Sequence, residues 1–425
     1  MEENMADEKS ATPVSGTILV VGGGISGITT ALEAAEVGHQ VFIAEKNPYL
    51  GGRVTRMYKY FPKLCPPSCG LEINFQRIKK NKNIKYFTLT EVEKITGEPG
   101  NYDVTLKETP RYVNSNCTCC GKCAEACDVE IPNEFNLGMD KTKAAYLPHE
   151  MAFPQRYVLH PSIIGTATAQ KCKDACTYNA IDLDMKPNTY TIKVASIVWA
   201  TGWNPYDAKK IDNLSFGKVK NVITNVMMER LSAPNGPTKG KIVRPSDGKT
   251  VENIAFVQCA GSRDENHLAF CSYICCLASL KQTTYIREAN PKSKATIFYI
   301  DLRTPGRYEK FYKKVKEDAN VSFVKGKVAK IEEDTATGDV IVTVEDTLSG
   351  KKLHEKFDMV VLATGMEPTT ATSKVPGNAK YDENNFVISG EILSTGCVKK
   401  PCDVMSSGQT ATGTALKAIQ MLGRR

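Results

Sequence analysis

A strand, a glycine-rich turn, a helix and a second strand follow one another between Thr17 and Glu45, and this unit constrains the fold most. The turn carries the pattern GxGxxG at Gly22, Gly24 and Gly27. In such a unit the glycines allow a tight turn, close approach of a pyrophosphate and packing of helix against strand. Glu45 ends the second strand, where a carboxylate accepts hydrogen bonds from a ribose. We therefore expect an α/β fold with a dinucleotide site; the alternative is a glycine-rich turn without a ligand.

The dinucleotide is expected to be FAD rather than NAD. A Gly-Gly-Arg loop that contains Gly52 and Arg53 resembles the second glycine pair of flavoproteins of the glutathione reductase type, which lies along the flavin diphosphate. Two later strands end in Ala-Thr-Gly, the first at Thr201 and Gly202 and the second at residues 363–365. Paired strands of this kind are typical of the same architecture, which contains two dinucleotide-binding domains.

A second α/β segment follows the first Ala-Thr-Gly strand. Its expected elements are strand Ile254–Gln258, helix Cys271–Ala289, strand Ala295–Asp301, helix Glu309–Glu317 and a hairpin with strands Val321–Val324 and Asp339–Val344. This segment resembles the NAD(P)H domain of the same architecture, but it has no GxGxxG pattern. A nicotinamide pyrophosphate would therefore lack its glycines and its helix N-terminus, and cysteines stand in their place.

The chain is expected to divide into a tail, an interrupted flavin domain, an insertion and a second nucleotide-type domain. The boundaries are 1–15 for a flexible tail, 16–111, 183–249 and 368–425 for the FAD-binding domain, 112–182 for a ferredoxin-like insertion, and 250–367 for the second domain. The sequence contains no uninterrupted stretch of about 18 apolar residues, so no membrane-spanning helix is expected. A net charge of +8 without a dense basic block gives nucleic acid binding little support.

Fifteen cysteines without a secretory signal predict a reducing, cytoplasmic setting rather than a disulfide framework. The cysteines from Cys117 to Cys127 stand in the C-x2-C-x2-C-x3-C spacing of bacterial ferredoxins, whereas the second half-motif keeps only Cys172 and Cys176. In a two-cluster ferredoxin the fourth cysteine of each motif serves the other cluster. One [4Fe-4S] cluster is therefore predicted, with the ligands Cys117, Cys120, Cys123 and Cys176. A structural zinc site of four thiolates is the alternative.

A second constellation joins the end of one strand to the start of the next helix. Cys259 ends the strand, and Cys271, Cys275 and Cys276 begin the expected helix. Cys271 and Cys275 would share a helix face through their i, i+4 spacing, and Cys276 could turn in from the helix end. Four thiolates could then converge at the carboxyl edge of the sheet, where α/β folds bind ligands. Buried, inert cysteines are the alternative.

These cysteines lie within runs that closely resemble the A subunit of heterodisulfide reductase, a flavin and iron–sulfur electron-transfer protein. The runs are NVITNVMMERLSAPNGPTKGKIVRPSDGKTVENIAFVQCAGSRD, FCSYICCLASLKQT and IFYIDLRTPGRYEKFY, joined by LCPPSC and NIKYFTLTEVEKITGEPGNYDV nearer the N-terminus. The resemblance covers nearly the whole chain from about Thr17. It implies an atypical [4Fe-4S] cluster on the second constellation, giving two clusters in all. It also places Gly396 and Asp403 of the final strand, turn and helix near the flavin.

Within this family, the short length and the incomplete second ferredoxin half are most similar to the A subunit of the quinone-interacting membrane-bound oxidoreductase complex of sulfate-respiring bacteria. This resemblance implies an electron-transfer protein with no catalytic side-chain constellation and no substrate site of its own. Its implied partners are a second flavin and iron–sulfur subunit, a membrane quinone-reactive subunit, and a soluble reductase such as adenylylsulfate reductase. The expected location is the cytoplasm, at the membrane through those partners.

Two other readings compete with this one. The first is a self-contained NAD(P)H-dependent flavin disulfide reductase that uses Cys65 and Cys69, whose C-x3-C spacing departs from the C-x4-C of disulfide reductases. The second is a zinc-stabilised assembly subunit with an empty flavin fold. Cys397 and Cys402, near the C-terminus, are expected to be structural.

Overall fold

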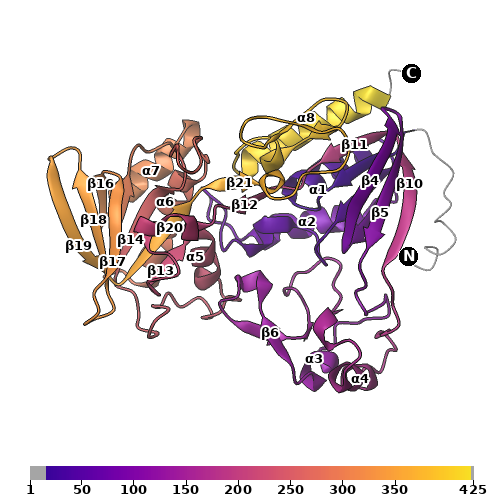
Figure 1. Ribbon diagram of the computed structural model, residues 1–425, viewed down its shortest axis with the longest axis horizontal. Coiled ribbons are helices and arrows are strands. Elements are labelled where there is room, and N and C mark those ends of the chain that lie inside the picture. The colour runs from indigo at the N-terminus through magenta and orange to yellow at the C-terminus, as the bar shows by residue number, and fades with distance from the viewer. Residues whose placement is uncertain (1–15, 423–425) are drawn as a thin grey trace.

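Two five-stranded parallel sheets organise the computed structural model, which describes residues 16–422 (Figure 1). The first sheet has the strand order β24-β11-β1-β2-β3. Its members are β1 (Ile18–Val21), β2 (Val41–Glu45), β3 (Ile84–Thr88), β11 (Ser196–Trp199) and β24 (Leu393–Ser394). Three separate parts of the chain therefore build this first domain, and the βαβ unit predicted from the glycine pattern lies at its centre.

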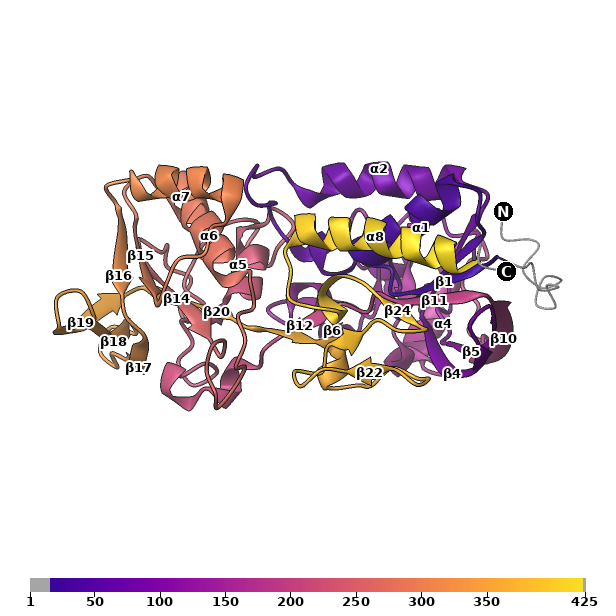
Figure 2. The same cartoon turned by 90° about the horizontal axis from the view of Figure 1, so that it is seen from above.

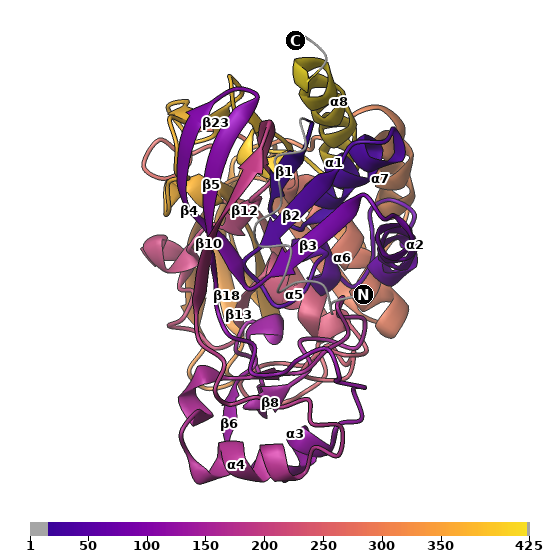
Figure 3. The same cartoon turned by 90° about the vertical axis from the view of Figure 1, so that its right-hand side faces the viewer.

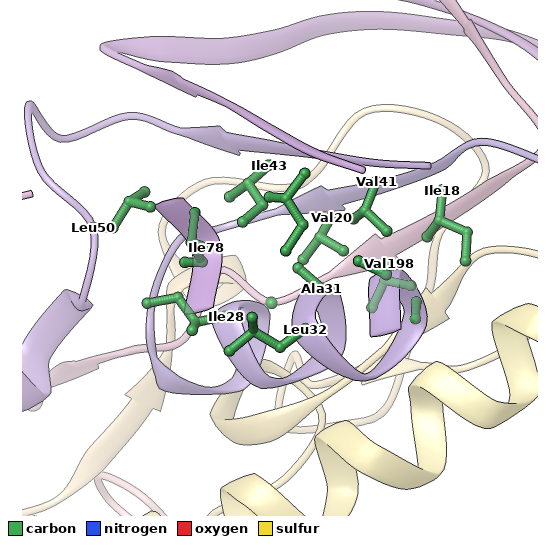
Figure 4. Packing of buried hydrophobic residues seen from close by; sticks show 14 of the residues in the cluster. Ile18, Val20, Ile28, Ala31, Leu32, Val41, Ile43, Leu50, Ile78 and Val198 are labelled. Atoms are coloured by element: carbon green, nitrogen blue, oxygen red, sulfur yellow. The ribbon is translucent and has the colours of Figure 1, made fainter. Parts of the chain in front are cut away.

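Helices and an antiparallel sheet cover opposite faces of the first sheet. The helices are α1 (Ile25–Glu36), α2 (Pro67–Lys80) and α8 (Val404–Leu422), which lie together on one side (Figure 2), and the antiparallel strands are β4 (Thr90–Glu98), β5 (Asn101–Glu108) and β10 (Asn188–Val194). Because side chains alternate along a strand, Ile18 and Val20 pack against the helices (Figure 4), whereas Leu19 and Val21 pack against the antiparallel sheet. Burial of both faces explains the uninterrupted apolar run of β1.

The second domain repeats this three-layer design. Its parallel sheet runs β13-β20-β14-β15-β16, formed by β13 (Val222–Thr224), β14 (Asn253–Ala260), β15 (Lys294–Tyr299), β16 (Val321–Lys325) and β20 (Met359–Thr364). Helices α5 (Asn225–Ser232), α6 (Cys275–Ala289) and α7 (Glu309–Lys316) cover one face, and the antiparallel sheet of β17 (Val328–Glu333), β18 (Val340–Asp346) and β19 (Lys351–Phe357) covers the other. The α/β class predicted from the sequence is therefore confirmed.

Three details of the second domain differ from the sequence-based expectation. The expected helix Cys271–Ala289 begins only at Cys275, because Tyr273 adopts a left-handed φ of 67° that a continuing helix excludes. The expected hairpin strand Val321–Val324 is β16, which pairs in parallel with β15, and β18 forms its hairpins with β17 and β19 instead. The sequence predicts that residues 183–249 belong to the FAD-binding domain, but β13 within that range pairs with β20 in the second sheet.

A small lobe lies at the bottom of the view in Figure 3, beside the first domain. In the sequence it is inserted between β5 and β10. It contains α3 (Lys122–Ala126), α4 (Ala167–Asp174) and the two-stranded pairs β6 (Glu130–Pro132) with β7 (Lys141–Lys143) and β8 (Ala145–Tyr146) with β9 (Val158–Leu159). Its buried core includes Cys127 and Cys172 beside Leu159, Ile163 and Ala169. We refer to this segment, residues 112–182, as the insertion.

Two short strands connect the domains. Strand β12 (Trp203–Pro205) leaves the first sheet after β11, and β21 (Met366–Pro368) leaves the second sheet after β20. They pair antiparallel, so the two Ala-Thr-Gly strand ends lead into one shared ribbon. Within residues 16–422, no helix combines the length and the apolar character needed to cross a membrane.

Candidate functional site

Two glycine-rich loops meet at the carboxyl end of the first sheet. A Cβ on Gly27 would overlap the carbonyl oxygen of Gly22, so the third glycine of the pattern permits the close packing of helix on strand. A Cβ on Gly24 would have only the Cα of Gly52 in reach, at 3.8 Å. The amide of Gly51 donates to the carbonyl of Gly23 at 2.7 Å and holds the loops together. The backbone beside Gly24 is therefore left open for a ligand.

The first turn of α1 faces this opening. Gly24 is the N-cap of the helix, and no side chain in the described part of the chain bonds to its free amides there. The first turn also carries no acidic residue. Unpaired amides and the positive end of a helix dipole bind phosphate groups. The loops fit a pyrophosphate, and the assignment of Gly22, Gly24, Gly27 and Gly52 to the dinucleotide stays a prediction.

Glu45 lies where the sequence placed it, at the end of β2. Its carboxylate is buried and accepts from the amide of Gly23 at 2.6 Å, the amide of Asn47 at 2.8 Å and the side-chain amide of Asn47 at 2.6 Å. Burial raises the pKa of Glu45, and these hydrogen bonds oppose that rise. Glu45 thus ties the first loop to the tip of β2, and its contact with a ribose stays a prediction.

Arg53 points to the ribbon between the domains. Its guanidinium donates to the carbonyl of Trp203 and to Oδ1 of Asn204 at 2.7 Å, and its Cζ lies 5.1 Å from the centre of the Trp203 ring. Burial lowers its pKa to about 10. Just before this ribbon, Thr201 accepts a hydrogen bond from the hydroxyl of Thr369 at 2.8 Å. Arg53 and Thr201 therefore join the flavin-type loops to the segment that leads into the second domain.

The C-terminal segment closes the same site. Gly396 begins the 3-10 helix η9 (Gly396–Val398), and a Cβ there would overlap the side chain of Ser26 in the first turn of α1. Asp403 accepts from the amide of Ser406 at 2.8 Å, which caps α8. Its other carboxylate oxygen accepts from the hydroxyl of Tyr308 at 2.6 Å. Gly396 thus lies against the predicted pyrophosphate turn, and Asp403 bonds to protein groups of both domains.

The insertion gathers the predicted ferredoxin ligands around one small pocket. The pocket is lined by Cys117, Cys120, Cys123 and Cys176, together with Gly121 and Tyr157 and six other residues. Burial, with the neighbouring thiol of Cys117, raises the pKa of Cys123 to about 12. A free thiol there stays protonated, so a bound metal would have to displace its proton. The four cysteines that ferredoxin spacing predicts as ligands all line this pocket, and their binding of a cluster stays a prediction.

The two leftover cysteines of the ferredoxin pattern lie elsewhere, in the core of the insertion. Cys127 and Cys172 are buried, and Sγ of Cys172 donates to the carbonyl of Cys123 at 3.4 Å. Burial, with the thiol of Cys127, raises the pKa of Cys172 to about 12. Next to them, Asp128 accepts from Thr168 at 2.5 Å and from Lys171 at 2.7 Å. Cys127 and Cys172 therefore lie apart from the pocket, and their absence from the cluster's ligands stays a prediction.

The second constellation assembles differently from the expectation. Cys271 lies in the loop before α6, so the argument that Cys271 and Cys275 share a helix face is wrong. Its sulfur instead accepts from the amide of Tyr273 at 3.4 Å. Cys259 has a φ of 55°, next to the point where the register of β14 with β20 shifts. A β-bulge and a left-handed loop, rather than a helix face, orient these thiols.

The four thiols of this constellation are electrostatic neighbours at the carboxyl edge of the second sheet. Burial raises the pKa of Cys275 well above its usual value, and the sulfurs of Cys259, Cys276 and Cys271 raise it further. Cys276 accepts from the amide of Arg303 at 3.4 Å. The four cysteines therefore lie close enough to affect one another's charge, and their use as a cluster site stays a prediction. Among residues 16–422, no three His, Cys, Asp or Glu side chains are arranged to hold a metal ion.

Two arginines beside these thiols were missed from the sequence. The guanidinium of Arg263 hydrogen-bonds to Cys259 and lowers its pKa, opposing the larger effect of burial. The thiol of Cys271 is the main cause of a raised pKa for Arg303. Both arginines also bond to Asp301. They follow the ends of the neighbouring strands β14 and β15, and that position was the signal that could have identified them.

Cys65 and Cys69 do not form part of either thiol group. Cys65 lies before α2 and Cys69 lies in its first turn, and both are exposed. The sulfur of Cys65 is 3.9 Å from the carbonyl of Lys63. The cysteine pair that the disulfide-reductase alternative requires is therefore exposed to solvent.

The amino-acid sequence is similar to known flavin and iron–sulfur proteins. Residues 17–67 match the family model described as FAD dependent oxidoreductase. One of the two iron-sulfur A subunits of CoB--CoM heterodisulfide reductase from Methanopyrus kandleri is 36% identical over 427 residues, covering 96% of this chain and 65% of that protein. The A subunit of the H(2):CoB-CoM heterodisulfide,ferredoxin reductase of Methanothermobacter thermautotrophicus is 34% identical over 415 residues, covering 96% and 62%. The chain spans 54–65% of the length of the curated relatives it matches.

The fold is similar to that of thioredoxin reductases. The enzyme of Lactococcus lactis aligns with a TM-score of 0.52 and 11% identity, covering 96% of this chain and 100% of that one. The enzyme of T. acidophilum aligns with a TM-score of 0.50 and 14% identity, covering 95% and 96%. At such low identity the likeness shows the fold alone. It confirms the predicted architecture of two dinucleotide-binding-type domains.

Proposed function

Because 83–98% of this chain aligns with the A subunits of heterodisulfide reductases, which are its relatives, we propose that it is an oxidoreductase component that transfers electrons between FAD and [4Fe-4S] clusters. The observation that carries this proposal is the pocket of the insertion, where Cys117, Cys120, Cys123 and Cys176 come together. Two half-motifs separated by the 44 residues 128–171 supply these thiols. Ferredoxin-type spacing predicts these four residues as ligands, and their position around one pocket supports that prediction.

FAD would be held by the first domain. Gly24 and Gly52 leave the backbone open to the pyrophosphate, and the amides of the first turn of α1 would bind its charge. When bound, the flavin supplies a centre that accepts two electrons together and releases them singly to one-electron clusters. Arg53 and Gly396 border the same space and would exclude water from it.

The second cluster would lie on Cys259, Cys271, Cys275 and Cys276. Thiolates and sulfides give such a cluster negative charge, which Arg263 and Arg303 would stabilise. The carboxyl edge of the second sheet, where a nicotinamide nucleotide binds in related folds, would then hold a redox centre. The chain's own part is to orient these thiols and to place the two cationic side chains.

We further infer that the chain works within a membrane-associated complex. Its partners would be a second flavin and iron–sulfur subunit, a quinone-reactive membrane protein and a soluble reductase such as adenylylsulfate reductase. The support for this finer assignment is the resemblance of the incomplete ferredoxin motif to that of the quinone-interacting complexes of sulfate respiration. Electrons would enter and leave through docked proteins, because the sequence offers neither a nicotinamide fingerprint nor a catalytic constellation.

Purification of the native complex under anaerobic conditions tests this function. We expect one FAD per chain, and iron and sulfide sufficient for two four-iron clusters. The co-purifying subunits would include a quinone-reactive membrane protein. Zinc without iron and sulfide would overturn the proposal in favour of a structural assembly role. A lone monomer that oxidises NADH with a small-molecule acceptor at full rate would replace the relay with a self-contained reductase.

That self-contained reductase is the second candidate, and the observation that favours it is a pair of exposed cysteines beside and within the first turn of α2. The exposed Cys65 and Cys69 would be its dithiol. Mixing the FAD-loaded chain with NADH in a stopped-flow spectrometer separates the candidates. Only this reductase is expected to show rapid bleaching of the flavin by NADH. In that case the Cys65→Ser, Cys69→Ser variant should still show the bleaching but should fail to reduce a disulfide substrate.

A further inference from the structure

Cys397 and Cys402 form a thiol pair to which the sequence assigned no chemical role. They flank the turn that joins η9 to α8, and their Sγ atoms lie 3.6 Å apart. Both are buried, with 8% and 3% of their surface exposed. The pair is therefore closed to bulk solvent, and its two sulfurs are already in contact.

The flavin-type site borders this pair on one side. Gly396, which precedes Cys397, lies against Ser26 in the first turn of α1. The sulfur of Cys397 also interacts electrostatically with the guanidinium of Arg53, whose loop carries the second glycine pair. Trp203, which follows the Thr201–Gly202 strand end, packs against the buried cluster of Met366, Cys397 and Cys402. Three segments of the predicted flavin site thus meet at Cys397.

The predicted atypical cluster borders the pair on the other side. Met366 belongs to the same buried cluster as the two thiols, and Ile274, which directly precedes Cys275, packs against that cluster. The amide of Met366 donates to Oγ of Ser272 at 2.8 Å, in the loop between Cys271 and Cys275. The thiol pair therefore lies between the groups that would hold FAD and those that would hold the cluster.

The immediate surroundings of the pair suit sulfur chemistry better than simple packing. Oγ of Ser407 lies 3.1 Å from Sγ of Cys402 and 3.8 Å from Sγ of Cys397. The hydrogen bond from Cys397 lowers the pKa of Cys402 and raises that of Cys397, because the shared proton stabilises one thiolate. Cys402 also lies near the N-terminal end of α8, where a helix dipole favours an anion, although the carboxylate of the neighbouring Asp403 acts to raise its pKa. Inert core cysteines need none of these polar partners.

We propose that Cys397 and Cys402 are a redox-active dithiol that exchanges two electrons with FAD; this proposal rests on the flavin site proposed above. Oxidation breaks the two S–H bonds, forms one S–S bond and releases two electrons and two protons. Oxidised flavin takes up both electrons and one proton, and the second proton leaves to solvent. In the reverse direction, reduced flavin returns the electron pair to the disulfide. The dithiol would then store a pair of electrons beside a cluster that carries one at a time.

Differential alkylation of the full chain tests this exchange without measuring activity. The FAD-loaded chain is equilibrated anaerobically with glutathione buffers of graded redox ratio, quenched in acid, alkylated and digested with trypsin. Cleavage between Lys399 and Lys400 separates the two cysteines, so a disulfide is detected as a pair of linked peptides. We expect that link in oxidised samples, and we expect photoreduction of the bound flavin, without added thiol, to convert it to two alkylated thiols.

Variants and flavin content make the outcomes distinct. Cys402→Ser removes the link, and its reductive titration should take up two electrons fewer per chain than wild type. Cys65→Ser with Cys69→Ser is the matched control, which should keep both the link and the electron count. Bound FAD with separately alkylated Cys397 and Cys402 in every buffer would overturn the dithiol and leave the proposed function intact. A linked pair in a chain that binds no FAD would overturn the proposed function and this exchange with it, leaving only a structural disulfide.

Discussion

At the residue scale, the proposed chemistry of this chain depends on two kinds of position: the glycines of the first loop and the cysteines that recur at a fixed spacing. The glycine pattern and the ferredoxin spacing could be read directly from the sequence, because both report local geometry that recurs whatever surrounds it. The neighbours of those positions could not be read. Arg263, Arg303 and the contact between Cys397 and Cys402 depend on strand ends and turns that only the folded chain brings together.

Substitutions of two glycines in the first loop are expected to have different effects, one on FAD binding and the other on stability. Gly24→Ala adds a Cβ that meets only the Cα of Gly52, at an ordinary contact distance, so the chain should fold but lose FAD affinity by about tenfold or more, roughly 1.4 kcal/mol. Gly27→Ala places its Cβ on the carbonyl of Gly22 and should lower stability instead. Flavin fluorescence after denaturation and the thermal midpoint measure the two effects. Unchanged flavin content in folded Gly24→Ala would show that the site lies elsewhere.

Substitutions of Cys176 and Cys172 test the ferredoxin assignment. Cys176 lines the pocket of the insertion, whereas Cys172 lies in the core and bonds to the carbonyl of Cys123. Cys176→Ser should therefore remove the cluster of the insertion and about half of the iron of the full chain. Cys172→Ser should retain the iron and lose only stability. The measurement is an anaerobic iron and sulfide count for each variant, and equal losses from both would contradict the assignment of a single cluster.

At the scale of elements, local sequence patterns located most strands and helices but not the way some of them begin or pair. The predicted helix from Cys271 to Ala289 is too long at its N-terminal end. The left-handed backbone of Tyr273 prevents the helix from starting before Cys275. Strand β16 has a pattern that suits a hairpin as well as a buried parallel strand, and only its pairing with β15 decides between them. Pairing of distant segments is set by packing, which periodicity does not encode.

The two residues of the buried ion pair between helices α5 and α6 should make coupled contributions to the free energy of unfolding. Lys281 lies 3.0 Å from Glu229, with 2% and 8% of their side chains exposed, and Lys281 also donates to the carbonyl of Lys59 at 2.7 Å. Glu229→Gln leaves a buried cation without its partner and should cost about 3–5 kcal/mol in the free energy of unfolding. Adding Lys281→Met should recover much of that loss. Urea denaturation of the three variants measures this, and an additive loss would contradict a coupled pair.

At the scale of the whole molecule, three units are held together by aromatic and cationic side chains that the sequence alone did not single out. Arg230, on α5 of the second domain, donates to Asn136 of the insertion at 2.8 Å and lies 4.6 Å over the ring of Phe135. His149 stacks on Phe135 and meets Tyr49 of the first domain edge-on. Electron transfer between cofactors depends on their separation, so this junction would fix the position of the insertion's cluster relative to the flavin.

The junction is expected to weaken in acid through His149. Burial, with the charges of Arg230 and Arg56, lowers the pKa of His149 to about 4, and its Nε2 is buried without a hydrogen-bond partner among residues 16–422. An unfolded histidine titrates near 6.5, so between about pH 6.5 and pH 4 the unfolded chain binds more protons than the folded one. The stability from neutral His149 is therefore complete above pH 6.5 and is lost as the pH falls towards 4, by up to about 3 kcal/mol.

His149→Phe keeps a ring against Phe135 and Tyr49 and removes the titration. Thermal unfolding of the loaded chain from pH 8 to pH 4.5 should therefore show a flatter decline for this variant than for wild type. Comparing the two chains cancels the acid sensitivity of cluster thiolates, because both carry the same cysteines. Hydrogen exchange would locate the effect: protection of the insertion should fall first in the wild-type chain at pH 5, while the sheets of the two domains stay protected. Parallel pH profiles of the two chains would mean that His149 is not the group that loosens the insertion.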